Sequence, residues 1–292
     1  WQGASESNMT KGLIMTDWMN ELDFAAMSLG NHEFDWGEEY IADNADFAEF
    51  PILGINVYDR KTNKISDFCE PSVMVEADGL QIGIIGAIGD CYSSIAVDKC
   101  DDVYFKVGSQ LTSLVKAESK KLRNQGADFI VYVIHDGYGS SKSGSVSASQ
   151  ISSYYDVSLS DGYIDLVFEG HTEQSYQLVD NCEVYHLQNS ANSHAAVSYV
   201  QIAYNTVLEE TELSSSKLIT VTEDEIANIV IPSEDEDDND TENGTNNTTN
   251  NSSKPSSPTQ DNSNSGCMHT DGDDNGICDT CSNSVLVYFD FY

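Results

Sequence analysis

Three apolar runs of this chain each lead into a polar cluster that contains a histidine. They are run 24–29 before Gly30-Asn31-His32-Glu33, run 129–134 before His135-Asp136-Gly137, and run 164–168 before Glu169-Gly170-His171-Thr172-Glu173. Buried strands of α/β proteins carry their functional groups at their carboxyl ends, so three such ends favour one shared site. Core packing explains three histidines at strand ends poorly. The sequence therefore predicts a metal site.

The alternative for each histidine is a purely structural role. A histidine at a strand end can simply cap a loop, and this would be the preferred interpretation of His135 taken alone. His186 and His194 lie outside any motif and are predicted to be structural. Glu33 and Asp35 are expected to fix their loop by side-chain hydrogen bonds rather than to bind metal.

The order of predicted elements favours a layered α/β domain. Helical spacing of apolar residues predicts helices over 9–22 and 38–50 and from Leu111 to a C-cap at Gly126. Strands are predicted at 24–29, 51–57, 73–75, 81–85, 129–134, 164–168, 184–187 and 196–202, the last two closing the fold in an antiparallel part. Asp78-Gly79 predicts a tight hairpin turn. Strands that alternate with helices indicate one domain over residues 1–225.

The remainder of the chain has a different composition. Residues 226–266 are acidic and then rich in Asn, Thr and Ser, which predicts a flexible, solvated linker. Residues 267–292 are expected to form a small module with Cys267, His269, Cys278 and Cys281, the residue types of a closed Zn²⁺ site.

Two other interpretations of this small module stay open. Asp271, Asp273 and Asn275 match the first half of a Ca²⁺ loop, but Ser282 stands where that loop needs a glutamate. In an oxidising compartment, two of the cysteines could instead form a disulfide. We rank a metal-stabilised or disulfide-stapled module above a functional Ca²⁺ sensor.

The charge of the chain excludes one class of partner. With 49 acidic and 13 basic residues the formal charge is −36, and no basic stripe exists to neutralise a nucleic-acid polymer. A small phosphorylated substrate stays compatible with this charge, because a metal cluster supplies positive charge locally. No apolar run is long enough to span a membrane.

Cysteines and glycosylation sequons favour an extracellular or cell-surface location. Cys91 and Cys100 bracket a polar loop and could form a disulfide there. Asn-x-Ser/Thr sequons begin at Asn243, Asn246, Asn247, Asn250 and Asn251. The chain begins at Trp1 without a methionine and is expected to be a fragment or a processed product, so a signal peptide would not be visible.

The stretch Gly30-Asn31-His32-Glu33-Phe34-Asp35-x-Gly37 resembles the signature of calcineurin-like metallophosphoesterases, in particular their 5′-nucleotidase and 2′,3′-cyclic-nucleotide phosphodiesterase branch. The similarity covers roughly residues 1–205 and continues through Thr10-Lys11-Gly12, 51–57, Gly83-Ile84-Ile85-Gly86, Gly126-Ala127-Asp128, His135 and 165–171. It implies an α/β/β/α sandwich, incomplete at its N-terminus, and hydrolysis of a nucleotide phosphoester by water activated between two divalent metal ions.

The resemblance also implies roles for single residues. Asn31, His135 and His171 would hold one metal of the Zn, Mn or Fe type, which suits mixed amide, imidazole and carboxylate ligands. His32 would not bind metal. It would lie over the substrate phosphate and stabilise the transition state or protonate the leaving oxygen.

Two departures from the family pattern limit the expected activity. The family's Asp-x-His and Gly-Asp motifs are absent and would precede Trp1. Glu173 replaces the second histidine of Gly-His-x-His, which would bind the other metal. A glutamate can still bind a metal through a longer, harder side chain, and the alternative is that this site has decayed, so Glu173 is a weak candidate ligand. We therefore expect the chain to be inactive or very weakly active by itself. The alternative function is a non-catalytic surface binding protein on a decayed phosphatase fold.

Overall fold

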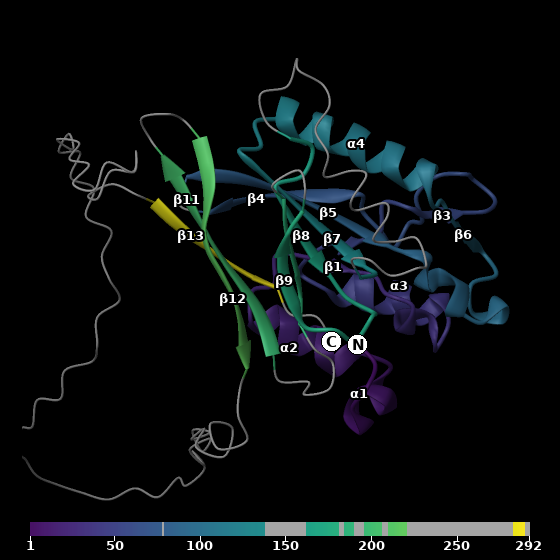
Figure 1. The fold of residues 1–292 in the computed structure, drawn as a ribbon. Coiled ribbons are helices and arrows are strands. Elements are labelled where there is room, and N and C mark those ends of the chain that lie inside the picture. Colours follow the sequence, from purple (N-terminus) through teal and green to yellow (C-terminus); the bar gives the residue numbers. More distant parts are fainter. Residues whose placement is uncertain are drawn as a thin grey trace, which may run out of the picture.

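The computed structural model describes residues 1–77, 79–137, 162–180, 184–189, 196–205, 210–220 and 283–289. Its largest sheet has six strands in the order β4-β5-β7-β8-β10-β9 (Figure 1). These are β4 (Ser72–Ala77), β5 (Leu80–Ile88), β7 (Phe129–His135), β8 (Leu166–Glu169), β10 (Tyr185–Gln188) and β9 (Tyr176–Val179). The strands β5, β7, β8 and β10 run parallel, while β4 and β9 pair antiparallel at the two edges.

One face of this sheet is covered by helix α4 (Ser109–Asn124), as Figure 1 shows. Leu111, Val115 and Leu122 recur at helical spacing and pack in one buried cluster with Ile130 and Tyr132 of β7. The helix is followed by Gly126, whose φ of 100° suits glycine and whose N–H donates to the Arg123 carbonyl. The predicted helix and its end are confirmed.

The opposite face of β5 and β7 packs against further strands. Leu53 of β2 (Ile52–Leu53) shares a buried cluster with Ile82, Val131 and Val200. The strand β2 pairs in parallel with β1 (Met27–Ser28). Val200 belongs to β11 (Ala196–Asn205), which lies between β12 (Glu210–Thr220) and β13 (Asn283–Phe289). Because both faces of β5 and β7 are covered, these strands are nearly continuous apolar runs.

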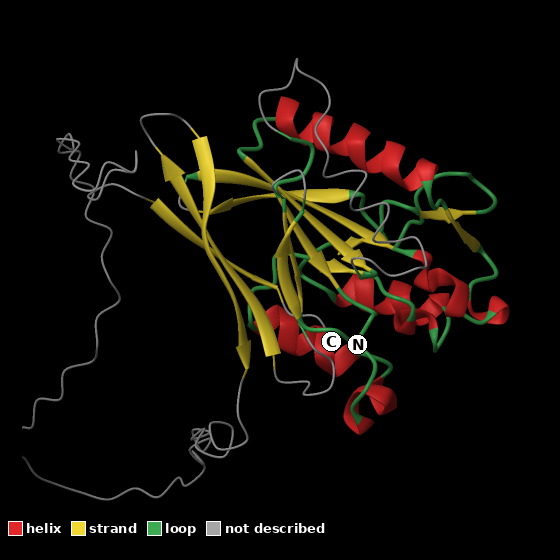
Figure 2. Cartoon of the chain, viewed as in Figure 1, coloured by secondary structure: helices red, strands yellow, loops and turns green. Residues whose placement is uncertain are grey.

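Outside this second β layer lie the helices α2 (Leu13–Glu21) and α3 (Glu38–Phe47), coloured red in Figure 2. Met19 of α2 and Ile41 of α3 join a third buried cluster with Leu29 and Ile52. The order of layers is therefore helix, sheet, sheet, helix. The predicted α/β/β/α sandwich is confirmed.

The helix predicted over residues 9–22 is interrupted, and this prediction was wrong. α1 (Ser5–Thr10) ends at Lys11, where φ is 55°, and α2 begins after Gly12, where φ is 92°. The Asn44 side chain donates to the Lys11 carbonyl at 2.7 Å, and a Cβ on Gly12 would lie 3.0 Å from Asn44 Oδ1. A residue of α3 thus stabilises the break, which local apolar spacing does not reveal.

Several predicted strands also differ from the observed ones. The strand predicted at 24–29 is reduced to β1, and that at 51–57 divides into β2 and β3 (Val57–Asp59), because Gly54 turns away to donate to the Glu70 carbonyl. β3 pairs with β6 (Val103–Phe105). β10 was expected in an antiparallel part, but it also pairs in parallel with β8. The predicted hairpin of β4 and β5 is confirmed.

The acidic linker 226–266 and the cysteine and histidine residues of the module 267–292 lie outside the described residues, so the linker, the module and the domain boundaries stay predictions. Within that last range, β13 pairs antiparallel with β11. Among the residues that the structure describes, no helix is both long and apolar enough to cross a membrane.

Candidate metal centre

The candidate centre lies at the edge of the main sheet where the parallel strands β5, β7 and β8 end. His135 is the last residue of β7, and Gly170 and His171 directly follow β8. β1 contacts β5 and β7, and from it the chain continues through Gly30 to Asn31. Parallel strands end on the same side of a sheet, so three segments far apart in the sequence deliver polar groups to one place.

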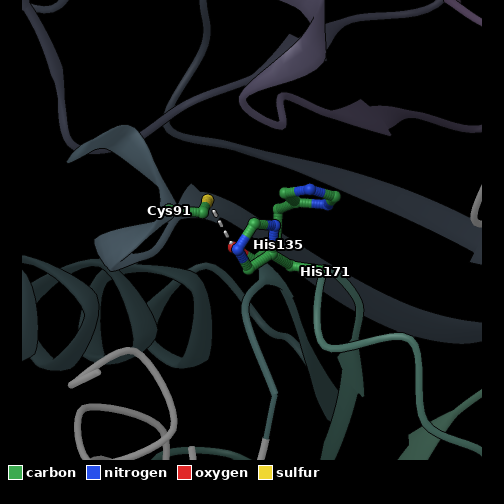
Figure 3. Close-up of side chains that lie close together, drawn as sticks. All are labelled: Cys91, His135 and His171. Atoms are coloured by element: carbon green, nitrogen blue, oxygen red, sulfur yellow. Dashed lines mark hydrogen bonds between the residues drawn. The ribbon is translucent and has the colours of Figure 1, made fainter. Parts of the chain in front are cut away.

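The imidazole of His135 lies between the Asn31 and His171 side chains. Its Nε2 lies 3.0 Å from Oδ1 of Asn31. Its ring centroid lies 5.3 Å from that of His171 with the planes at 61°, and Figure 3 shows the two rings close together. Asn31 is buried and His171 is exposed. The group is therefore anchored on its inner side and open to solvent at His171.

Two glycines make room for the His135 ring. A Cβ on Gly30 would lie 2.8 Å from Cδ2 of His135, and a Cβ on Gly170 would lie 3.1 Å from its Nδ1. Burial lowers the pKa of His135 to about 4 although the nearby Glu33 carboxylate opposes this shift. The ring is neutral at physiological pH, and neutral imidazole is the form that binds metal ions.

Hydrogen bonds fix the loop after β1, as expected for Glu33 and Asp35. The buried Glu33 accepts the N–H of Gly30 through Oε2 at 2.7 Å, which holds the backbone against His135. Nδ1 of His32 lies 2.9 Å from Oδ2 of Asp35. The His32 side chain is 62% exposed, so it stands on the surface beside the buried Asn31.

No model of a known protein family matches the chain, but single proteins do. The chain is 28% identical over 177 residues to a 5′-nucleotidase of Vibrio parahaemolyticus, in an alignment that covers 59% of this chain and 30% of that protein. It is 30% identical over 169 residues to a 2′,3′-cyclic-nucleotide 2′-phosphodiesterase/3′-nucleotidase of Yersinia enterocolitica, covering 56% of this chain and 25% of that protein.

Solved structures share the fold. A 5′-nucleotidase precursor from Thermus thermophilus superposes with a TM-score of 0.57 at 21% identity, over 77% of this chain and 44% of that one. A calcineurin-like phosphoesterase from Bacillus subtilis superposes with a TM-score of 0.53 at 18% identity, over 73% of this chain and 69% of that one. The chain is thus similar in sequence to 5′-nucleotidases and cyclic-nucleotide phosphodiesterases, and it shares the fold of a solved calcineurin-like phosphoesterase. It spans 30% of the length of its Vibrio parahaemolyticus relative.

Among the described residues, one group of side chains has the spacing of metal ligands, and it contains a cysteine. Cys91, His135 and His171 each offer a ligand atom, all within 4.8 Å of one another (Figure 3). Cys91 is buried and donates through Sγ to the His135 carbonyl at 2.9 Å. Burial raises the pKa of the Cys91 thiol, and the Asp136 carboxylate raises it further.

Sequence analysis missed Cys91 as a candidate ligand because it was assigned to a disulfide. Cys91 and Cys100 are both free thiols, so that disulfide hypothesis was wrong. Cys91 lies in the 3₁₀ helix η2 (Asp90–Ser94), which follows the apolar run of β5. A polar group directly after an apolar strand is the same signal that identified His135.

Glu173, the weak candidate for the other metal, does not belong to this group of three side chains. Glu173 is exposed, and both Glu173 and His171 have positive φ, 60° and 68°. Such a backbone is uncommon for residues other than glycine, and strained turns of this kind concentrate at functional sites. The ligand role of Glu173 stays a prediction. The candidate cluster Cys267, His269, Cys278 and Cys281 lies outside the described residues.

Another histidine, His186, belongs to a buried polar network next to β8. His186 is fully buried, with Nδ1 3.2 Å from Oε1 of Glu169 and Nε2 3.3 Å from Oδ2 of Asp180. The Tyr176 hydroxyl donates to the other Glu169 oxygen at 2.5 Å. Glu169 immediately precedes Gly170 and His171, so this network anchors the end of β8 from which His171 extends.

Proposed function

We propose that the protein is a metal-dependent hydrolase of nucleotide phosphoesters. The observation that carries the proposal is the convergence of Asn31, His135 and His171 from three strand ends, beside the exposed His32. The 5′-nucleotidase and the cyclic-nucleotide phosphodiesterase among its relatives support a nucleotide as the small phosphorylated substrate.

The residues present fit a divalent ion. Asn31 offers an amide oxygen at 3.0 Å from the His135 nitrogen, which is neutral because burial lowers the pKa of His135 to about 4. Amide oxygen and neutral imidazole are ligands that Zn²⁺, Mn²⁺ and Fe share. A bound ion would supply a Lewis acid for the phosphoryl oxygens and lower the pKa of a bound water. A second ion, with Glu173 among its ligands, belongs to this proposal.

His32 is the residue proposed to act on the substrate. Asp35 holds Nδ1 of His32 at 2.9 Å, which fixes the ring orientation and assigns the proton transfer to Nε2. From the surface beside Asn31, this nitrogen would donate a hydrogen bond to the phosphoryl group or a proton to the leaving oxygen. Together with the metal ligands beneath it, His32 would form the phosphate-binding surface.

The test is phosphate release from 5′-AMP and bis-p-nitrophenyl phosphate with Mn²⁺ or Zn²⁺, by the protein as its gene encodes it. Positioned acid–base groups contribute about 10²–10⁴-fold, so His32→Ala should lower kcat by about that factor. His194→Ala, which changes a histidine without motif support, is the control. Metal-dependent turnover that is unchanged in His32→Ala would overturn the proposed role of His32. No metal-dependent turnover by the unsubstituted protein would overturn the proposal that it is a hydrolase.

A second candidate is a non-catalytic binding protein on the same fold. The replacement of the family's second histidine by the exposed Glu173 favours this function, because a lost second metal leaves phosphate binding without hydrolysis. Metal-dependent binding of 5′-AMP with no turnover would support it. In either case we propose an extracellular or cell-surface location, which the sequons between Asn243 and Asn251 support.

A further inference from the structure

The position of Cys91 is fixed by the strands that carry the metal centre. Ile88, the last residue of β5, stands opposite His135 in the parallel register of β5 and β7. The N–H of Gly89 donates to the His135 carbonyl at 3.2 Å, and Cys91 Sγ donates to the same oxygen at 2.9 Å. The thiol is therefore tied to the end of β7 through the backbone of the histidine that lies at the middle of the centre.

The separation of the three side chains is close to that of a metal site. The ligand atoms of Cys91, His135 and His171 lie within 4.8 Å of one another. Tetrahedral Zn²⁺ with bonds of about 2.3 Å to sulfur and 2.0–2.1 Å to nitrogen places its ligand atoms about 3.5 Å apart. We expect the His171 side chain to move to close the remaining gap, because His171 is exposed and follows β8 in a turn, whereas Cys91 is buried.

A second buried cysteine shows what is particular to Cys91. Cys69 is also a free, buried thiol, and it packs in the same apolar cluster as Cys91. The group with metal-ligand spacing among the described residues includes Cys91 and not Cys69. Burial alone makes a thiol a small core residue. The difference between the two is the pair of imidazoles beside Cys91.

We propose that Cys91 is a thiolate ligand of the metal that His135 and His171 hold, with the Asn31 oxygen as a weaker donor. The proposal rests on the proposed function for the identity of the metal centre. Binding would replace the S–H hydrogen bond to the His135 carbonyl by a sulfur–metal bond and release the thiol proton to solvent. A site with one thiolate and two imidazoles selects Zn²⁺ or Co²⁺ over Mn²⁺ and Mg²⁺, which prefer oxygen ligands.

The test uses the full chain with Cys100, Cys182, Cys267, Cys278 and Cys281 changed to serine, which leaves only the buried pair Cys69 and Cys91. Titration with Co²⁺ alone should produce the near-ultraviolet absorption band of thiolate-to-cobalt charge transfer at one ion per chain. Cys91→Ser should remove this band and weaken Zn²⁺ binding by at least about tenfold, since even loss of an outer-shell partner costs that much. Cys69→Ser should leave both unchanged.

Each other outcome overturns the proposal. Co²⁺ that binds without a thiolate band, or a band that survives Cys91→Ser, would show that Cys91 is not a ligand, while the hydrolase proposal would stand or fall on its own assay. Absence of Co²⁺ binding would overturn the metal centre itself. If Cys91→Ser fails to fold, the Cys69→Ser variant decides the question: a band that it retains belongs to Cys91, and a band that it loses overturns the proposal.

Discussion

Two histidines of this molecule, His135 and His186, are held in opposite ways. Nε2 of His135 lies against the Asn31 amide oxygen, and the exposed His171 ring stands next to it. His186 lies between two buried carboxylates, those of Glu169 and Asp180, and is fully buried. The comparison teaches that partners and access, rather than the histidine itself, separate a candidate metal ligand from a structural residue. The first centre is open to solvent at His171, and the second is closed between two buried carboxyl groups.

The largest expected effect is on Zn²⁺ affinity, which should depend on His135 and not on His186. His135→Ala removes the central ligand and should reduce Zn²⁺ binding at this centre below detection by calorimetry, in the chain with its tail cysteines changed to serine. His186→Ala should retain Zn²⁺ binding, because neither carboxylate partner of His186 belongs to the ligand group. Equal Zn²⁺ affinity of the His135→Ala variant and its parent would break the comparison.

The second expected effect is on folding stability, which should depend on His186. His186→Ala removes a shared hydrogen-bonding partner of the buried Glu169 and Asp180 side chains, and a buried polar group left without its partner costs about 1–3 kcal/mol. Urea unfolding of the metal-free chain measures this free energy. The exposed His32 offers the matched control, since its alanine variant should change stability by no more than about 0.5 kcal/mol. A His186→Ala loss no larger than that of the control would contradict the assignment of His186 to structure.

A smaller effect tests whether the space that Gly30 leaves for the His135 ring sets the ligand geometry. Gly30→Ala places a Cβ 2.8 Å from the imidazole, and overpacking of this kind costs about 1–3 kcal/mol. The displaced ring should also bind Zn²⁺ more weakly. In Gly79→Ala no atom lies within 4 Å of the new Cβ, so the positive φ alone should lower stability without changing Zn²⁺ affinity. Wild-type Zn²⁺ affinity in Gly30→Ala would show that the glycine cradle does not set the ligand geometry.

The sequence predicted those elements of the fold whose structure depends on residues close to one another in the chain. The apolar runs of β7 and β8, the amphipathic spacing of α4 and the turn between β4 and β5 each reveal their structure within a few residues. The break at Lys11 and Gly12 escaped prediction because Asn44, more than 30 residues away, stabilises it. The parallel pairing of β10 with β8 likewise depends on partners that no local pattern specifies.

The candidate site divides in the same way. Asn31, His135 and His171 follow apolar strands, and that position alone placed them at one edge of a sheet. Cys91 follows the apolar run of β5 too, but the nearby Cys100 makes a disulfide the competing interpretation, and spacing in the sequence does not reveal the place of Cys91 beside His135. The hydrogen bonds of His186 to Glu169 and Asp180 depend on the β8–β10–β9 arrangement, which sequence spacing does not reveal.

Three strand ends of this fold are proposed to form one metal centre. Anomalous diffraction at the zinc absorption edge, from crystals of the chain grown with Zn²⁺, tests it most directly. We expect an anomalous peak about 2.0–2.1 Å from a ring nitrogen of both His135 and His171, at the carboxyl edge of the main sheet. Zinc peaks found only elsewhere in the chain, with the centroids of these two rings still 5.3 Å apart, would contradict it.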